Sequence, residues 1–235
     1  MFSEDASRVS LNDAFIGLFM LTISVVGLLK GYELIMDARV RNLADQVVKI
    51  QSSYYKFIDF YRETPGDWSF KEASSVIPGI EIGGNGNGRL DLIDGDPWVE
   101  SLAVWEHLCK AKFLDADYLR ESKVSGKGVV KVPINAFGAP MILFSSRDYY
   151  DVSEKPVKRV GLILGRGTPV SVLAKLDKKI DDGYPATGVI RYVANMSNTF
   201  GDLSKSGSKC IDDTKTPAVW LVGEPEMKCN AIHLY

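Results

Sequence analysis

The most prominent pattern along the chain is a long apolar run near the N-terminus that passes directly into an amphipathic stretch. Ala14 to Leu29 contains sixteen residues without a charge. Tyr32 to Tyr61 contains neither Pro nor Gly, and its apolar positions recur in steps of three, four and occasionally five, which places them on one face of an α-helix. These positions are Leu34, Ile35, Ala38, Leu43, Val47, Ile50, Tyr54, Phe57, Ile58 and Tyr61. The pattern predicts one helix from Leu11 to Tyr61, ended by the Pro-Gly pair in Thr64–Asp67.

The apolar run favours a membrane-inserting helix that is retained in the mature protein. Sixteen residues rise about 24 Å as a helix, and the run can be extended to Ile35 to approach the ~30 Å thickness of a bilayer core. A cleavable signal peptide fits poorly, because Glu4 and Asp5 precede the run with only Arg8 as a positive charge, and no small-x-small site follows. A buried core helix is the alternative. Charge alone leaves the orientation open, and a literal positive-inside reading places the C-terminal part in the cytoplasm.

The remainder of the chain has the pattern of an α+β domain. A Gly/Asn/Asp-rich loop over 78–97 precedes an amphipathic helix from Trp98 to Phe113, and a second short helix is predicted over Val170–Ile180. Strands are predicted at Val129–Ile134, Met141–Ser145, Val160–Leu164, Val189–Val193 and Val219–Val222. We therefore expect an antiparallel sheet laid on the amphipathic half of the first helix.

Several short segments, in matching order, resemble the type IV pilin and type II secretion pseudopilin family. Val9–Asp13 is similar to the family's Phe-(Thr/Ser)-Leu-(Ile/Val)-Glu box, with Val9 in place of Phe and Asp13 in place of Glu. Three further matches are the Thr-Pro-Gly-Asp-Trp segment at 64–68, the Gly/Asn-rich segment at 83–90 and the Glu-Ser…Trp-x-His-Leu helix at 100–108. A fourth is the Asp-x-Lys-Ile-Asp-Asp-Gly-x-Pro-x-Thr-Gly segment at 177–188.

The resemblance implies a pilin-like architecture with four parts. These are a leader at 1–8, a transmembrane or filament-core half-helix at 9–36, an amphipathic half-helix at 37–64 and a globular head at 65–235. It also implies a processing site between Arg8 and Val9, where the family has a Gly before the cleaved bond and this chain has Arg8. In the family the box carboxylate pairs with the N-terminal amine of a neighbouring subunit, which gives Asp13 an assembly role. The alternative is that Asp13 caps the first turn of the helix.

The three cysteines divide into one in the second helix and two near the C-terminus. Cys109 lies on the apolar side of its helix and is expected to be a buried free thiol. A bridge between Cys210 and Cys229 would close a loop of about twenty residues, worth roughly 3 kcal/mol in the chain-entropy model. The family resemblance and export to an oxidising compartment favour this disulfide, and two free thiols in a reducing compartment are the alternative.

No enzyme motif was found. His107 and His233 belong to no zinc pattern, and the chain has neither a nucleophile elbow nor a phosphate-binding loop. The best ligand signal is a run of alternating oxygen side chains and Gly that suits calcium, made up of Asn85, Asn87, Asp91, Asp94 and Asp96. The EF-hand order fails because Arg89 stands where Asp or Asn is required, and a Gly-rich turn with Asx bonds is the alternative. Asp181–Gly183 is a weaker candidate of the same kind.

Composition and charge narrow the functional classes. The chain has 235 residues, with 28 Lys+Arg and 30 Asp+Glu, so its formal net charge of -2 offers no basic excess for nucleic acid. An aromatic cluster at the end of the long helix is expected to be core, with a binding surface as the alternative. It consists of Tyr54, Tyr55, Phe57, Phe60, Tyr61 and Trp68.

The family resemblance, taken with these patterns, implies a structural subunit of a type IV pilus or type II secretion pseudopilus-like filament, not an enzyme. The expected partners are copies of itself or other pilin-like subunits, an inner-membrane assembly platform and the lipid bilayer. The expected location is the bacterial inner membrane, single-pass, with the head in the periplasm or in an extracellular filament. A head of about 170 residues also fits a minor or tip pilin. The alternative is a signal-anchored periplasmic enzyme or ligand-binding domain.

Overall fold

The fold was analysed in a computed structural model of the chain, which describes residues 11–91, 93, 95–124, 128–153, 155–193, 210–223 and 227–235. The chain divides into two compact units, Met1–Arg39 and Val40–Tyr235. The second unit, here called the head, contains the C-terminal part of the first helix and all other elements. The predicted leader at 1–8 lies outside the described residues.

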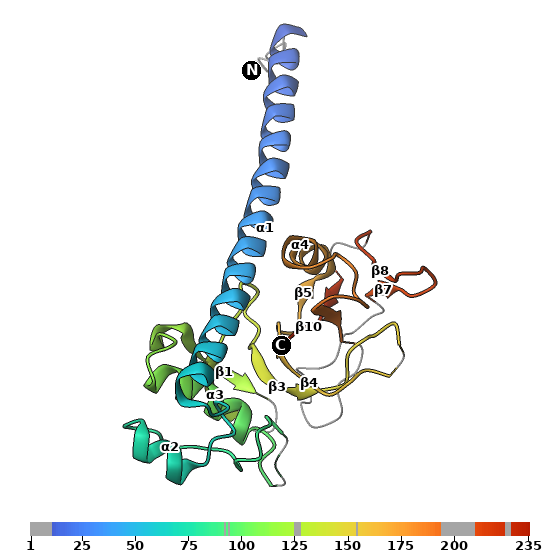
Figure 1. Cartoon of the computed structure of the whole chain (residues 1–235). Coiled ribbons are helices and arrows are strands. Elements are labelled where there is room, and N and C mark those ends of the chain that lie inside the picture. The colour runs from blue at the N-terminus through green and yellow to red at the C-terminus, as the bar shows by residue number, and fades with distance from the viewer. Residues whose placement is uncertain are drawn as a thin grey trace. The chain divides into compact units, whose positions relative to one another are not determined.

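The first helix, α1, runs from Leu11 to Tyr61 and has the predicted bounds (Figure 1). Its apolar N-terminal part is exposed over nearly its whole length, and Leu28 is 75% exposed. The helix contains a segment long and apolar enough to cross a membrane. Such a segment is compatible with a single-pass membrane anchor.

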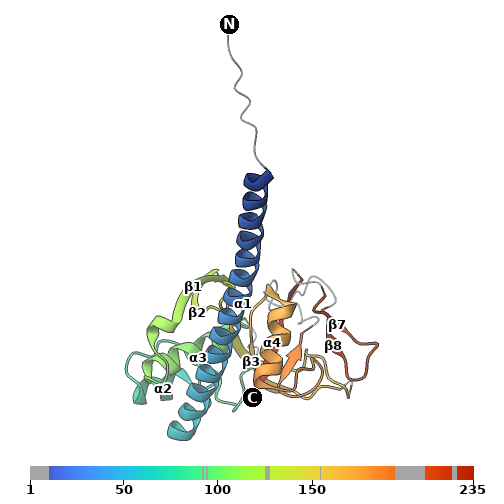
Figure 2. The ribbon, with the colours of Figure 1, turned by 90° about the horizontal axis from the view of Figure 1, so that it is seen from above.

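The C-terminal half of α1 supplies one wall of the core of the head. Leu43, Val47, Ile50 and Phe57 are fully buried, as the amphipathic pattern predicts. The Ser53 hydroxyl donates to the carbonyl of Phe113 at 2.8 Å. On one side of this part of α1 lie α3 (Val99–Lys110) and the hairpin of β1 (Leu119–Val124) and β2 (Gly128–Pro133) (Figure 2). On the other side lies α4 (Val170–Ile180).

The largest sheet among the described residues has four antiparallel strands in the order β3-β4-β10-β6. They are β3 (Ile142–Ser146), β4 (Arg159–Ile163), β10 (Ala231–Leu234) and β6 (Ile190–Tyr192). The C-terminal strand β10 is central and all four of its residues are buried. The sheet is therefore complete only when β10 has paired with both β4 and β6.

Smaller elements complete the head. Two-stranded pairs are formed by β1 (Leu119–Val124) with β2 (Gly128–Pro133), β5 (Thr168–Pro169) with β9 (Lys228–Cys229), and β7 (Ile211–Asp212) with β8 (Val219–Trp220). The helices are α2 (Phe70–Val76), α3 (Val99–Lys110) and α4 (Val170–Ile180), with a 3-10 turn at Ala116–Tyr118. The predicted α+β class, the two later helices and strands at all five predicted places are confirmed, whereas α2, β1, β5, β7, β9 and β10 were not predicted.

Two expectations about single groups need refinement. Cys109 is a free thiol as expected, but it is half-buried and not fully buried. Burial still raises the pKa of Cys109 to about 11, with a further contribution from Asp115. In the aromatic cluster, Tyr54, Phe57 and Trp68 are core, whereas Tyr55 and Phe60 are exposed, so the prediction of a core cluster holds for only part of it.

Candidate functional site

The first candidate site is the apolar surface of α1 between residues 14 and 35. Its large side chains are exposed, including Phe15, Phe19, Leu21, Leu28 and Leu34. One ion pair interrupts it, where Lys30 Nζ lies 2.8 Å from a carboxylate oxygen of Glu33. An exposed apolar surface of this extent marks a membrane or protein interaction site. The described part of this surface is thus chemically suited to lipid or to other apolar helices.

The predicted assembly and processing residues lie at the start of this surface. Asp13 is in the first turn of α1, which begins at Leu11. Arg8 and Val9 lie outside the described residues, and so does the side chain of Asp13. Their predicted roles in processing and subunit pairing therefore stay predictions.

The second candidate site is the segment Gly83–Asp91, here called the Asn-Gly loop, which two buried carboxylates hold in place. Asp67, in the Thr-Pro-Gly-Asp turn after α1, accepts from the N–H groups of Asn87 at 3.0 Å and Gly88 at 2.6 Å. Glu100, in the first turn of α3, accepts from the N–H groups of Asn85 at 3.1 Å and Asp91 at 2.5 Å. Two carboxyl side chains of the head itself therefore hold the backbone of the loop.

A third carboxylate and a histidine extend the same support to the segment before the loop. Glu106 of α3 accepts from the N–H groups of Glu81 at 2.6 Å and Ile82 at 3.2 Å. The Nδ1 of His107 accepts from Gly66 N–H at 3.1 Å, so its Nε2–H is the donor to the carbonyl of Ile82 at 3.0 Å. Burial lowers the pKa of His107, which keeps the ring neutral and both bonds intact.

Glycine is required where the loop crosses the turn. A Cβ on Gly83 would lie 2.3 Å from the backbone N of Phe70, and one on Gly84 would lie 2.5 Å from the backbone of Asp67. Neither backbone atom can move aside cheaply, so a side chain at either position would separate loop and turn. The Gly-rich composition of the segment thus serves close backbone packing.

Three of the predicted calcium residues, Asn85, Asn87 and Asp91, belong to this loop and already accept other donors. The side-chain oxygen of Asn85 accepts from Asn87 N–H, and that of Asn87 from Arg89 N–H. Asp91 pairs with Lys158 and accepts from the side-chain amide of Asn87. Burial raises the pKa of Asp91, but the hydrogen bonds from Lys158 and Asn87 outweigh this effect and hold the pKa below its ordinary value.

Two predicted calcium ligands remain. Asp96 accepts from Trp98 N–H at 3.2 Å, two residues along the chain, and Asp94 lies outside the described residues. The loop has the Asx bonds of the alternative interpretation, and calcium binding here stays a prediction.

A separate acidic group forms at the C-terminal end of α4. Asp177, Asp181 and Asp182 bring carboxylate oxygens within 4.8 Å of one another, and Asp181–Gly183 was the weaker candidate in the sequence. Asp177 accepts from the indole N–H of Trp220 at 2.7 Å. Asp181 accepts from Ile190 N–H at 2.8 Å. Burial raises the pKa of Asp177 to about 6, and the two neighbouring carboxylates add to this against the hydrogen bond from Trp220.

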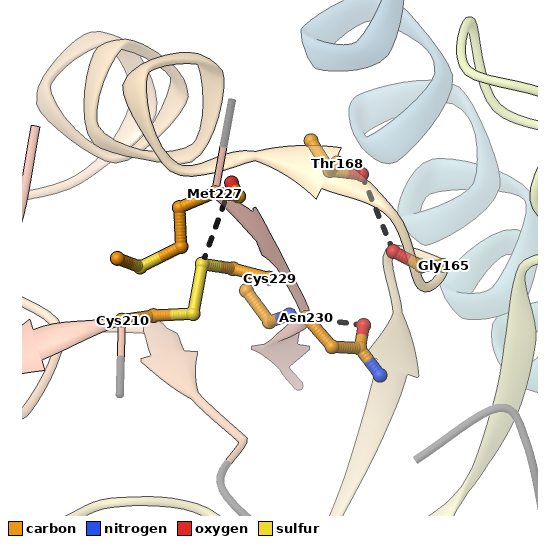
Figure 3. Close-up of a disulfide and its surroundings, with 7 residues drawn as sticks. Gly165, Thr168, Cys210, Met227, Cys229 and Asn230 are labelled. Carbon is orange, nitrogen blue, oxygen red and sulfur yellow. Dashed lines mark hydrogen bonds between the residues drawn. A yellow bond between two sulfur atoms is a disulfide. The ribbon is translucent and has the colours of Figure 1, made fainter. Parts of the chain in front are cut away.

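The predicted disulfide between Cys210 and Cys229 is present (Figure 3). Both cysteines are fully buried. Cys229 lies in β9 opposite Thr168 and is separated from β10 by Asn230 alone. The disulfide therefore fixes the chain immediately before β10, the central strand of the sheet.

Substituting Glu100 tests whether the Asn-Gly loop depends on its carboxylate anchors. In Glu100→Gln one of the two backbone N–H groups would face an amide NH₂ and lose its acceptor, which costs about 1–3 kcal/mol for a buried donor. Burial raises the pKa of Glu100, so removing its charge offsets part of this cost. We expect a net loss of about 1 kcal/mol in the free energy of unfolding, measured by urea denaturation. Glu63→Gln, at an exposed position, is the matched control. Equal effects of the two substitutions would contradict the anchoring role.

The anchoring residues were not identified in the sequence. Asp67, Glu100, Glu106 and Lys158 are common charged residues whose partners are up to 67 positions away. Only the local Thr-Pro-Gly-Asp and Glu-Ser signals marked two of them, and neither signal indicates which backbone groups they bind. The loop itself was identified from its Gly/Asn composition.

Comparisons with protein-family models, with curated proteins and with solved structures each return no match for this chain. What the chain does has therefore to be argued from its own residues.

Proposed function

We propose that this chain is a structural subunit of a type IV pilus or type II secretion pseudopilus-like filament. Its apolar half-helix would anchor it in the bacterial inner membrane before assembly and pack against other subunits in the filament. The observation that carries the proposal is the composition of α1 (Leu11–Tyr61). One uninterrupted helix is apolar and exposed over its first part, whereas the apolar face of its last part is buried in the core of the head.

Two further features support the proposal. The Cys210–Cys229 disulfide fits a head that folds outside the reducing cytoplasm. The segments that resemble the family, from Val9–Asp13 to 177–188, occur in the order expected for such subunits. A filament needs contacts that do not close on themselves, and a long apolar helix presented to its neighbours can supply them.

The membrane part of the proposal is tested by a charge at the centre of the apolar surface. Val25→Arg places a guanidinium near the midpoint of residues 14–35, which costs about 2.5–3.5 kcal/mol for insertion at a helix centre. We expect Val25→Arg to reduce the fraction of protein that resists alkaline extraction from membranes. Val76→Arg, the same substitution at an exposed valine of the head, should leave this fraction unchanged. Equal behaviour of the two variants would contradict membrane insertion through α1.

The filament part is tested by photo-crosslinking in cells that carry a pilin assembly platform. A photoreactive residue in place of Leu21 should give adducts at successive multiples of the chain mass, because each subunit would contact the next. The same residue in place of Val157, which is 71% exposed in the head, is the matched control. A membrane-inserted protein that gives no homotypic adducts at Leu21 would contradict the filament proposal. That result would favour the signal-anchored enzyme or binding domain instead.

A further inference from the structure

The Asn-Gly loop contains two Asn-Gly dipeptides in succession, Asn85-Gly86 and Asn87-Gly88. All four residues are exposed. An Asn followed by Gly is chemically labile, because the glycine has no side chain to hinder attack of its backbone nitrogen on the preceding amide. The two sites share their sequence, loop and access to water, but the structure surrounds their reacting atoms differently.

At Asn87 a hydrogen-bond partner lies against each reacting group. The attacking group, Gly88 N–H, donates to Asp67 Oδ2 at 2.6 Å. The amide oxygen Oδ1 of Asn87 accepts from Arg89 N–H at 2.9 Å. The departing nitrogen Nδ2 of Asn87 lies 3.2 Å from Asp91 Oδ2.

These three partners match what cyclisation requires. A carboxylate on the attacking N–H can serve as general base, and an N–H on the amide oxygen stabilises the negative charge that develops there. Asp67 is 2% exposed and also accepts from Asn87 N–H at 3.0 Å. It therefore accepts from the N–H groups of both Asn87 and Gly88 and holds the backbone in place at the reacting residue.

At Asn85 the base is missing. The corresponding attacking group, Gly86 N–H, donates to the backbone carbonyl of Asp67 at 2.8 Å. A peptide carbonyl is a far weaker base than a carboxylate. Oδ1 of Asn85 does accept an N–H, from Asn87 at 3.0 Å, so the two sites differ chiefly in the partner of the attacking nitrogen.

We propose that Asn87 is a self-catalysed deamidation site with Asp67 as its general base. The Gly88 nitrogen forms a bond to Cγ of Asn87 while Asp67 accepts the proton of that nitrogen. The Cγ–Nδ2 bond then breaks and Nδ2 leaves as ammonia, taking up the proton held by Asp67. The product is a five-membered succinimide, with no change in oxidation state.

Water from the solvent completes the conversion. It adds to either carbonyl of the succinimide and opens the ring to aspartate or isoaspartate at position 87. The new carboxylate faces Asp91, so the hydrogen bond between Asn87 and Asp91 is replaced by repulsion between two anions. The reaction thus converts a closed loop into a more acidic and more open one without any added enzyme.

The test uses Asn85 as the control within the same chain. The detergent-solubilised full-length protein is incubated in mildly alkaline buffer, once folded and once unfolded in urea. Peptide mapping by mass spectrometry then gives the rate of amide-to-acid conversion at each site. In urea the two rates should be similar, because the sequences around the two sites are alike. In the folded protein Asn87 should react on the order of tenfold faster than Asn85, below the usual range for general acid–base catalysis because the base is a weak one.

A variant identifies the base. Asp67→Asn keeps the shape of the side chain but removes the carboxylate, and we expect the folded preference for Asn87 to disappear. Asp67 is buried, so its substitution can itself unfold the head. The wild-type measurement is therefore a sufficient test without the variant. It compares the ratio of the Asn87 rate to the Asn85 rate in the folded protein with the same ratio in urea. A folded ratio equal to the urea ratio, or a faster Asn85, overturns the proposal, and so does the absence of conversion at Asn87 in the folded protein. Retention of the preference in a folded Asp67→Asn variant also overturns it, because the base would then lie elsewhere.

Discussion

Replacing Cys210 and Cys229 together with alanine is expected to lower the free energy of unfolding of the head by about 3 kcal/mol. The two cysteines are 19 positions apart, so the disulfide removes the entropy of a loop of that length from the unfolded chain. The loop that the disulfide closes ends next to the central strand of the sheet. Cys229 is separated by Asn230 alone from β10, the central strand of the four-stranded sheet. Without the disulfide this strand has to pair with β4 and β6 from a freer chain.

The measurement is thermal or urea unfolding of the solubilised protein, followed by near-UV circular dichroism. Wild-type protein treated with a thiol reductant should lose the same stability as the double variant. Cys109→Ala is the matched control, since Cys109 is a free thiol and its replacement removes no crosslink. Unchanged stability in the double variant, or an equal loss in Cys109→Ala, would falsify the role assigned to the disulfide.

The long helix could be predicted because its signal is local and repeated. From Tyr32 to Tyr61 the same face is apolar at every turn, so no distant residue is needed to define the element. The sequence signal of strand β10 is neither local nor repeated. Its four residues, Ala-Ile-His-Leu, are too few to show alternation, and it becomes central only through pairing with residues 39 to 73 positions earlier. Strand order is a long-range property that local periodicity does not carry.

The candidate sites divide in the same way. The apolar surface of α1 follows from composition, and the Asn-Gly loop from its Gly and Asn residues. The anchors of that loop do not, because a carboxylate such as Asp67 acts by accepting from backbone N–H groups twenty positions away. Backbone groups are the same in every sequence, so no pattern of side chains indicates which of them a buried carboxylate will bind.

Acidification is expected to destabilise the head through His233, and a variant at this position should reveal how much. Burial lowers the pKa of His233 to about 4, with Arg159 acting in the same direction and Asp181 against it. An unfolded histidine has a pKa of about 6.5, so the folded state binds this proton less tightly. The stability is present above about pH 6.5 and is lost as the pH falls toward 4. The loss reaches about 2 kcal/mol at pH 5 and about 3 kcal/mol at pH 4.

Asp177 should act in the opposite direction over the same range. Its pKa is raised to about 6, above the ~3.9 of an unfolded aspartate, so the folded state binds its proton more tightly. Its contribution to stability is present at low pH and is lost as the pH rises through 6, which amounts to about 1 kcal/mol gained between pH 7 and pH 5. The change of the wild-type free energy of unfolding with pH is therefore the difference between these opposing contributions. His107 acts in the same direction as His233, because burial lowers its pKa as well.

Single variants separate the contributions of His233 and Asp177, which the wild type shows only as their sum. Between pH 7 and pH 5, His233→Gln should lose about 2 kcal/mol less stability than the wild type, and Asp177→Asn about 1 kcal/mol more. Both variants can be less stable at pH 7, so the quantity compared is the change with pH, taken from urea unfolding at each pH. Lys179→Gln, at an exposed position of α4, is the matched control and should follow the wild type. If His233→Gln instead shows the wild-type change with pH, the imidazole is not the group that makes the head sensitive to acid. The sensitivity would then belong to His107, whose Nδ1 accepts the Gly66 N–H beside the Asn-Gly loop.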